Sequence, residues 1–248
     1  MPKIKLDKSQ YIGMTETNDP AFNLDIFDKL YEGNIIITKR LTNKLIEKLI
    51  ENKDKCILHC TITGFGGTKI EPFVPNIEEA FSKFNQLIEQ GFPTEQIVLR
   101  IDPVIPTEKG INVAKNVLEL FKGSGIKRVR FSVLDMYKHV KERFEENGFP
   151  IPYDTFHAPY EIRKKVYNMF KEYGEKYNFD IEVCAEPGFE STPCLSQKDI
   201  DILGLTDKIT LVGSAEQRKS CGCYGNKKQL IMYNSSKCAN KCTYCYMK

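Results

Sequence analysis

Short apolar runs alternate with amphipathic stretches along the chain, in the repeated order strand and then helix. The apolar, β-branched runs predict strands at Tyr11–Met14, Ile35–Thr38, Cys56–Thr63, Gln96–Asp102, Arg128–Leu134, Ile181–Ala185 and Leu230–Tyr233, with a weaker one at Ile209–Val212. Apolar residues at helical spacing predict helices at Leu41–Asn52, Ile77–Gln90, Gly110–Lys122, Tyr160–Tyr177 and Gln197–Leu203. Asn76, followed three residues later by Glu79, marks the start of one of these helices.

Repeated strand–helix units predict the α/β class, with a parallel sheet and helices outside it. Right-handed crossovers curl such a sheet toward a partial or near-complete (β/α) barrel. The length of 248 residues fits one barrel-sized domain or two small ones, and the even alternation favours a single domain over residues 1–248. Ligands in such folds bind at the carboxyl ends of the strands, so polar residues just after a strand are site candidates.

Composition and charge favour a soluble protein of the cytoplasm with no membrane partner. Hydrophobic residues make up 41% and charged residues 28% of the chain. The first residues, MPKIKLDKSQ, lack the apolar region of a secretion signal, and no window approaches the roughly 18 apolar residues of a membrane span. A net charge of +3 is too small to indicate a nucleic-acid partner. Basic stretches such as Lys39-Arg40 and Arg163-Lys164-Lys165 are therefore expected on solvated helix faces or at anion contacts.

The most specific motif is Cys238-Ala-Asn-Lys-Cys242-Thr-Tyr-Cys245, one of several places where the nine cysteines cluster. In a reducing compartment, clustered cysteines indicate metal ligands. Three thiolates on one short loop can bind three corners of a 4Fe–4S cube and leave the fourth iron open to S-adenosylmethionine (SAM). The alternative is a zinc knuckle completed by Cys221 or Cys223, because structural zinc takes four ligands. The motif directly follows the last predicted strand, which places it at the rim of the barrel and favours the cube.

This cysteine loop resembles the signature of the radical SAM superfamily. Most of the chain is similar to a group of bacterial proteins whose cluster motif lies at the C-terminal end. The segments that carry the resemblance are Thr17–Phe22, His59–Gly66, Leu99–Val104, Phe131–Lys138, Cys184–Glu186 and Arg218–Tyr246. The resemblance implies a circularly permuted radical SAM barrel, whose first strand and cluster loop have moved to the end of the chain. It also implies a lyase, associated with queuine cleavage to a preQ1-type deazapurine in queuosine salvage.

The resemblance implies a cofactor site made of the cluster, SAM and an electron donor such as flavodoxin or ferredoxin. Cys238, Cys242 and Cys245 would hold the 4Fe–4S cluster, and Tyr244 would lie near the SAM adenine or else only pack the loop. The glycines Gly66 and Gly67 match the segment that meets the SAM amino group. The acid expected after them is absent: Thr68 stands there and Glu71 follows three residues later.

Two neighbouring strands supply further candidates for SAM contacts. Arg100 and Asp102 alternate with apolar neighbours, so both should point into the barrel. There Arg100 could hold a carboxylate through two hydrogen bonds while Asp102 binds a hydroxyl or a base edge. The structural alternative is a buried Arg–Asp ion pair. Ser132, at the end of the next strand, is expected at the SAM ribose or carboxylate.

Four polar residues are candidates for binding a small nucleobase-like substrate. Glu186 follows a strand, and its carboxylate could accept two N–H donors of a guanine-like edge. Asp19, His59 and Asp135 are the others, each at or near a strand end. Only three histidines are present, so a histidine-rich metal site is not expected.

Four more cysteines, Cys184, Cys194, Cys221 and Cys223, could form a second, zinc-binding site. The alternative is that they are reduced thiols that pack as small apolar residues, which is also expected for Cys56 and Cys60. Two other functions compete with the lyase. One is radical SAM repair or modification of nucleic acid, as in spore photoproduct lyase, and the other is a non-enzymatic zinc-binding module.

Overall fold

The computed structural model describes residues 6–215, 221–232 and 238–247. Its centre is a sheet of seven strands in the order β6-β5-β4-β3-β2-β1-β7, in which every neighbouring pair is parallel. The strands are β1 (Ile12–Met14), β2 (Gly33–Thr38), β3 (Cys56–Thr61), β4 (Ile97–Val104), β5 (Arg128–Val133), β6 (Asp180–Val183) and β7 (Lys227–Gln229). The predicted α/β class is therefore confirmed. Within the described chain the sheet is open, with β6 and β7 at its two edges.

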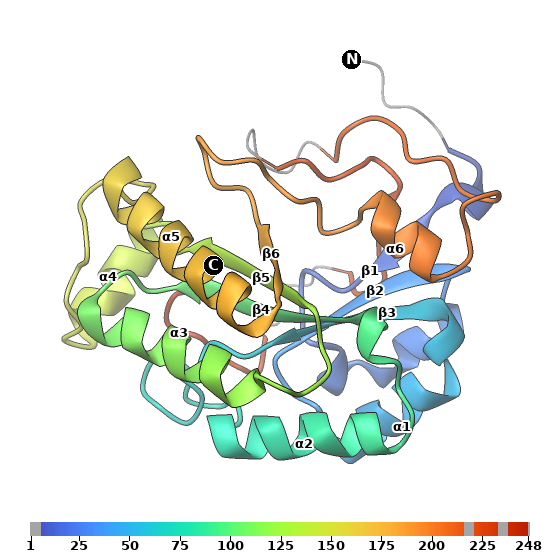
Figure 1. The fold of residues 1–248 in the computed structure, drawn as a ribbon, viewed down its shortest axis with the longest axis horizontal. Coiled ribbons are helices and arrows are strands. Elements are labelled where there is room, and N and C mark those ends of the chain that lie inside the picture. The colour runs from blue at the N-terminus through green and yellow to red at the C-terminus, as the bar shows by residue number, and fades with distance from the viewer. Residues whose placement is uncertain (1–5, 216–220, 233–237, 248) are drawn as a thin grey trace.

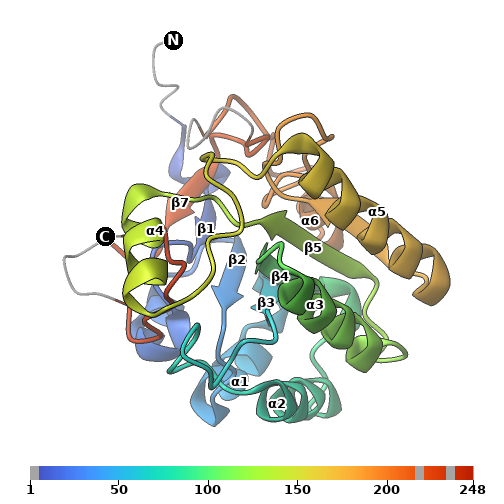
Figure 2. The same ribbon diagram turned by 90° about the vertical axis from the view of Figure 1, so that its left-hand side faces the viewer.

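Helices cover the sheet, which curves from β7 through β2 to β5 (Figures 1 and 2). In chain order they are α1 (Asn43–Glu51), α2 (Ile77–Glu89), α3 (Glu108–Phe121), α4 (Lys138–Glu146), α5 (Tyr160–Tyr177) and α6 (Gln197–Ile202). Short 3-10 turns connect several elements, among them Pro20–Phe22 after β1. None of the helices in the described ranges is both long and apolar enough to cross a membrane.

The two faces of the sheet belong to two separate apolar clusters. Leu58 and Leu99 pack with the residues of α1 to α5 in the larger cluster. Ile57 and Val98, their chain neighbours, point to the other face and pack with the segments after β6, including α6. Successive strand residues point to opposite faces, and both faces of a parallel sheet are normally covered. We call the face of Ile57 and Val98 the inner face.

The helix starts follow from side-chain caps that the sequence specifies. The Asn76 side chain accepts the Glu79 N–H at 2.8 Å, which confirms the predicted start of α2. Thr42 and Thr107 cap α1 and α3 in the same way. Each cap satisfies one of the free N–H groups of a first helical turn.

Three elements differ from the sequence prediction. Strand β7 ends at Gln229, just before the predicted Leu230–Tyr233, although the Leu230 N–H still donates to the Met14 carbonyl at 2.8 Å; Tyr233 lies outside the described residues. Ile209–Val212 forms no strand, because the Val212 N–H bonds to the Asn226 side chain and not to a neighbouring strand. Helix α4 was not predicted, since only two of its residues, Val140 and Phe144, are buried.

Candidate functional site

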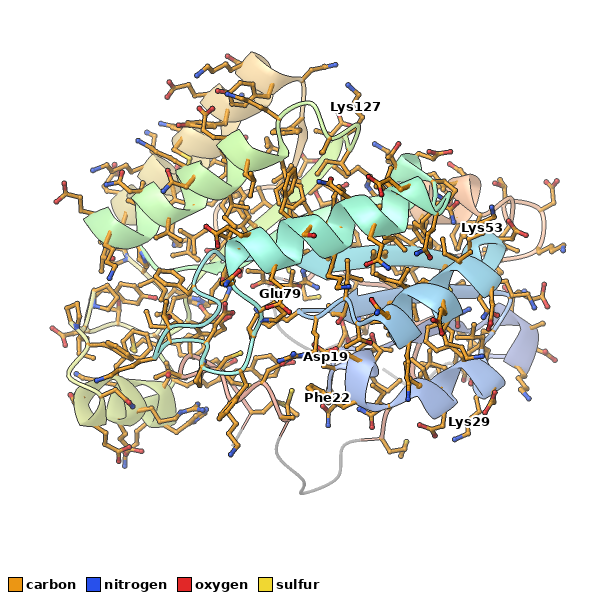
Figure 3. All side chains as sticks on the ribbon, turned by 90° about the horizontal axis from the view of Figure 1, so that it is seen from below. Asp19, Phe22, Lys29, Lys53, Glu79 and Lys127 are labelled. Carbon is orange, nitrogen blue, oxygen red and sulfur yellow. The ribbon has the colours of Figure 1, made fainter. Side chains whose placement is uncertain are left out.

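The C-terminal cysteine loop lies at the carboxyl ends of the strands. It follows β7, and the Thr17 hydroxyl, after β1, donates to the Ile231 carbonyl at 2.7 Å. Within the loop, the Asn240 amide donates to the Asp19 carboxylate at 2.8 Å. Figure 3 shows Asp19 and Phe22 close to this loop. The segment after β1 therefore anchors one side of the cysteine loop.

Segments that follow β3 and β5 hold the other side of the loop. The Thr243 N–H donates to the Ile70 carbonyl and its hydroxyl to the Lys69 carbonyl, each at 2.9 Å. From α4, the Arg143 guanidinium donates to the Cys245 carbonyl. Loops that are far apart in the sequence thus meet around the three cysteines, at the edge where α/β folds bind ligands.

The three thiols are neighbours on two successive turns. The Lys241 N–H donates to the Cys238 carbonyl at 3.2 Å, and the Cys245 N–H donates to the Cys242 carbonyl at 3.1 Å. Lys241 has a positive φ of 47°, which reverses the chain between the turns. The pKa of the Cys242 thiol is raised to about 12, mainly by burial, against the opposing charge of Lys39 and with smaller contributions from the charges of Glu71, Cys245 and Cys238. Each of these thiols therefore lies within electrostatic reach of the others.

The chemistry of this donor set fits a cluster bound at three corners. The other cysteines of the described residues lie elsewhere: Cys56 and Cys60 belong to the helix-facing core, and the remaining four to the inner-face region. Across the described ranges, no three or more His, Cys, Asp or Glu side chains close around a single ion. A 4Fe–4S cube binds each thiolate to a separate iron, so it does not require the sulfurs to converge on one point.

A buried polar group connects the cysteine loop to the loop after β3. The Glu71 side chain is 1% exposed and accepts from Lys39 Nζ at 2.9 Å and from the Thr63 hydroxyl at 2.6 Å. Tyr244 donates to the same carboxylate and accepts from Lys39 Nζ at 2.8 Å. The expected packing role of Tyr244 is thus observed, and its contact with an adenine stays a prediction.

Lys39 brings a positive charge to the cysteine loop. Burial lowers its pKa, but the charges of Glu71 and Cys242 raise it more, so the net pKa lies above the ordinary lysine value. The ammonium also lies 5.3 Å from the centre of the Tyr244 ring. Of the two environments expected for this lysine, the anion contact is observed and the solvated helix face is not, because the side chain is 18% exposed and follows a strand.

The glycines after β3 are explained by the turn that they form. A Cβ at Gly66 would lie 1.7 Å from the Pro75 carbonyl oxygen, which no side chain can tolerate. Gly67 has a φ of +74°, a conformation that glycine adopts at little cost. Its N–H donates to the Val74 carbonyl at 2.9 Å. A contact between these glycines and SAM stays a prediction.

Arg100, Asp102 and Ser132 come together at the ends of β4 and β5. Arg100 forms the buried ion pair with Asp102 that was the structural alternative, and the Ser132 hydroxyl donates to the same carboxylate. Burial lowers the pKa of Arg100, but Asp102 and two nearby thiols raise it well above its ordinary value. The Nε of Arg100 is buried without a partner, so the guanidinium still has a free donor.

The hydrogen-bond partners of Asp19 are groups that hold neighbouring segments of the fold together. Besides Asn240, its carboxylate accepts from the Thr38 hydroxyl at 2.7 Å and from the Lys39 and Ala21 N–H groups at 2.9 and 3.0 Å. These four donors account for both oxygens. The residue joins the segments after β1 and β2 to the cysteine loop, and its predicted contact with a substrate is untested.

Glu186 and Asp135 lie near each other at the β5–β6 end of the site. Burial raises the pKa of Glu186 to about 7, against the opposing hydrogen bond from the Val133 N–H at 2.7 Å. Asp135 contributes further to the rise and accepts from His157 Nδ1 at 2.7 Å. Arg163 approaches Glu186 to 3.9 Å and is itself buried, so of the two environments expected for it the anion contact is observed and the solvated helix face is not. A carboxyl with this pKa can both donate and accept hydrogen bonds near neutral pH.

His59 lies deeper, on the inner face of β3. It is completely buried, and neither ring nitrogen has a hydrogen-bond partner. Burial and the charges of Arg130 and Arg100 lower its pKa well below the ordinary value, so the ring is neutral. An unpartnered buried polar group is costly, which marks this position as one where a ligand could contribute a hydrogen bond.

The comparison with protein families places nearly all of the candidate site within one matched region. A family model described as a domain of unknown function, DUF1848, matches residues 29–247. The chain belongs to this family. No curated protein matches the chain. The DUF1848 region includes every candidate residue named above except Asp19.

Several residues of this DUF1848 site were not among the sequence candidates. Lys39 directly follows β2 and Glu71 lies in the loop after β3. The rule that polar residues just after a strand are site candidates, which we call the strand-end rule, could therefore have selected both. Arg143 comes from the unpredicted helix α4. Arg163 and Tyr153 are buried near Glu186 and come from segments with no strand-end signal.

Proposed function

We propose that this protein is a radical SAM enzyme whose 4Fe–4S cluster is bound by Cys238, Cys242 and Cys245. The observation that carries the proposal is the position of the cysteine loop, which the segments after β1, β3 and β5 surround at the carboxyl edge of the sheet. A zinc knuckle has no need of that position, whereas a reactive cluster requires a ligand-binding edge around it.

The sheet topology supports a permuted, partial radical SAM barrel. Strand β7 pairs with β1 although nearly the whole chain separates them, and the cysteine loop follows β7. In this reading β7 is the first strand of the barrel and β6 the last. The two edge strands of the open sheet, β6 and β7, are then the strands between which a partial barrel does not close.

When bound, the cluster and SAM supply a 5′-deoxyadenosyl radical, and the protein binds, orients and shields the reactants. Lys39 and Glu71 fix Tyr244 and with it the cysteine loop. The free donor of Arg100 is suited to the carboxylate of SAM. Asp102 pairs with that guanidinium and so orients it, and Ser132 in turn donates a hydrogen bond to Asp102. A flavodoxin or ferredoxin would supply the electron.

For the substrate we favour queuine, cleaved to a preQ1-type base. Because the pKa of Glu186 is about 7, the carboxyl is partly ionised at neutral pH. In its ionised form it can accept hydrogen bonds from two N–H groups of a deazapurine edge, and in its protonated form it can donate one to a ring acceptor. Asp135 is placed beside it, and His59 offers a neutral ring with free nitrogens. These are the hydrogen-bonding groups that a base with several donors and acceptors requires.

The test is turnover by the anaerobically reconstituted, reduced protein. With queuine and SAM we expect 5′-deoxyadenosine and preQ1 to form together, and Cys242→Ala to form neither. The matched control is Cys60→Ala, a buried cysteine of β3, which should retain activity. Turnover of another base or of DNA, with none of queuine, would end the lyase assignment. Undiminished 5′-deoxyadenosine formation by Cys242→Ala would refute the cluster ligands.

A further inference from the structure

Four cysteines outside the cysteine loop form a connected group at the inner face. Cys184 Sγ and Cys194 Sγ are 4.0 Å apart, and the Cys194 N–H donates to Cys223 Sγ at 3.2 Å. The Cys223 thiol also contacts the thiols of Cys194 and Cys221. Cys221 is half-buried and the other three are buried. We call these residues the inner thiol group.

The inner thiol group connects the two edges of the sheet. Cys184 directly follows β6, and Cys194 lies on the loop after it. Cys221 and Cys223 precede β7, the opposite edge strand. In Figure 2 the orange segments after β6 and before β7 lie above the strands, between β7 and α5. A bond among these thiols would therefore join segments that no strand pairing holds together in the described sheet.

The sulfur–sulfur distance between Cys184 and Cys194 in this group matches that of a site with a single metal ion. Tetrahedral zinc with Zn–S bonds of about 2.3 Å places its sulfurs roughly 3.8 Å apart, close to the 4.0 Å between Cys184 and Cys194. In the side-chain positions present, the thiols of the described chain form a row and do not surround one point. Binding of one ion by all four thiols therefore requires Cys184 and Cys221, at the ends of the row, to turn toward that ion.

The surroundings carry the charge that such a site needs. Four thiolates and one zinc ion have a net charge of −2, which is costly to bury without cations nearby. Arg100, Arg130 and Lys227 all lie within electrostatic reach of Cys194. Arg130 is fully buried, and its Nη2 donates at 3.0 Å to the carbonyl of Pro193, next to Cys194.

One of these cations, Arg130, has a donor with no partner. Arg130 Nη1 is buried and has no hydrogen-bond acceptor. Coordinated thiolates accept hydrogen bonds from such donors, as ligands of metal sites commonly do. The free donor of Arg130 is an observation independent of the thiol spacing, and it indicates an anionic group in this region.

We infer that Cys184, Cys194, Cys221 and Cys223 bind one zinc ion as four thiolates, and that this ion fastens the segments beside the two edge strands. Each thiol releases its proton to solvent as it binds the metal. Sulfur fills all four positions, so the ion is structural and leaves no position for a substrate. The inference does not depend on the proposed radical chemistry.

The experiment uses the chain with Cys238, Cys242 and Cys245 all replaced by alanine, so that zinc cannot bind at the cysteine loop. Purified under reducing conditions, this variant should contain one zinc per chain by elemental analysis. Replacing its zinc with cobalt should give the absorption spectrum of tetrahedral thiolate coordination. Adding Cys221→Ser, at the most exposed ligand, should weaken zinc binding at least tenfold in competition with a chromogenic chelator. Adding Cys60→Ala instead should leave zinc binding unchanged.

Three results would overturn the zinc site. One is a triple-alanine variant that neither contains zinc nor binds it on titration. Another is unchanged zinc affinity in both Cys221→Ser and Cys194→Ser. The third is a Cys184–Cys194 disulfide in protein purified with reductant. None of these results bears on whether the cysteine loop binds an iron–sulfur cluster. Conversely, a wild-type protein that lacks iron would contradict the proposed function but not the zinc site.

Discussion

The phenol of Tyr244 donates a hydrogen bond to the buried carboxylate of Glu71, although 173 positions separate the two residues. Lys39 Nζ contacts both of them. The C-terminal cysteine loop is therefore attached to the loop after β3 through a charged group that the rest of the fold buries. Hydrogen bonds to buried charges are among the strongest in proteins, so this contact fixes the position of the loop.

We expect Tyr244→Phe to lower the free energy of unfolding by about 2 kcal/mol, because it removes a buried hydrogen bond to a charged acceptor. Urea denaturation under reducing conditions measures the change. The control is Tyr246→Phe, whose residue is 48% exposed and which should cost less than about 0.5 kcal/mol. Equal effects of the two substitutions would contradict the attachment.

A second prediction concerns pH and Glu186. Its pKa of about 7 in the folded state exceeds the ordinary value of 4.5, mainly because the carboxyl is buried. Between these two pKa values the folded protein holds a proton that the unfolded chain has lost. Stability from this group is therefore complete below pH 4.5 and is lost as the pH rises through 7, by about 3 kcal/mol in total.

Glu186→Gln tests this prediction because glutamine keeps an acceptor for the Val133 N–H but does not titrate. The free energy of unfolding, measured against pH, should fall less steeply between pH 4.5 and 7 in the variant than in the wild type. Glu190→Gln, at an exposed position, should leave the slope unchanged. Identical slopes for Glu186→Gln and wild type would show that Glu186 is not protonated in the fold.

His59→Leu should separate stability from binding. The ring is buried with both nitrogens unpartnered, and an apolar replacement of similar size relieves that cost, so the ligand-free protein should be unchanged or up to about 1 kcal/mol more stable. Binding of queuine or SAM, measured by calorimetry, should weaken at least tenfold. A variant that is destabilised by more than about 2 kcal/mol yet binds normally would show that His59 only supports the fold.

The sheet could be predicted well because its strands are apolar runs bounded by turn residues and helix caps. β3, β4 and β5 each begin within one residue of their predicted start. The exceptions have physical reasons. β7 consists of Lys227, Lys228 and Gln229, polar residues that have no strand pattern and pair with β1 through the backbone. α4 has only one apolar pair on its buried face.

The site could be predicted only as far as the strand-end rule reaches. That rule brought out Asp102, Ser132 and Glu186, which lie at the ends of β4, β5 and β6. It could not show that Glu71 and Tyr244 meet, because that contact depends on how two distant loops fold against each other. Nor could it find the buried Arg130, whose charge would exclude it from a core by sequence alone.

The most direct test of the account is the metal content and electron paramagnetic resonance of the anaerobically prepared, reduced wild-type protein. We predict four irons and four sulfides per chain at the C-terminal loop, and a signal from the reduced cluster that changes when SAM is added, because one iron has no protein ligand. The same loop holding one ion bound only by protein ligands, with no iron signal that responds to SAM, would contradict it.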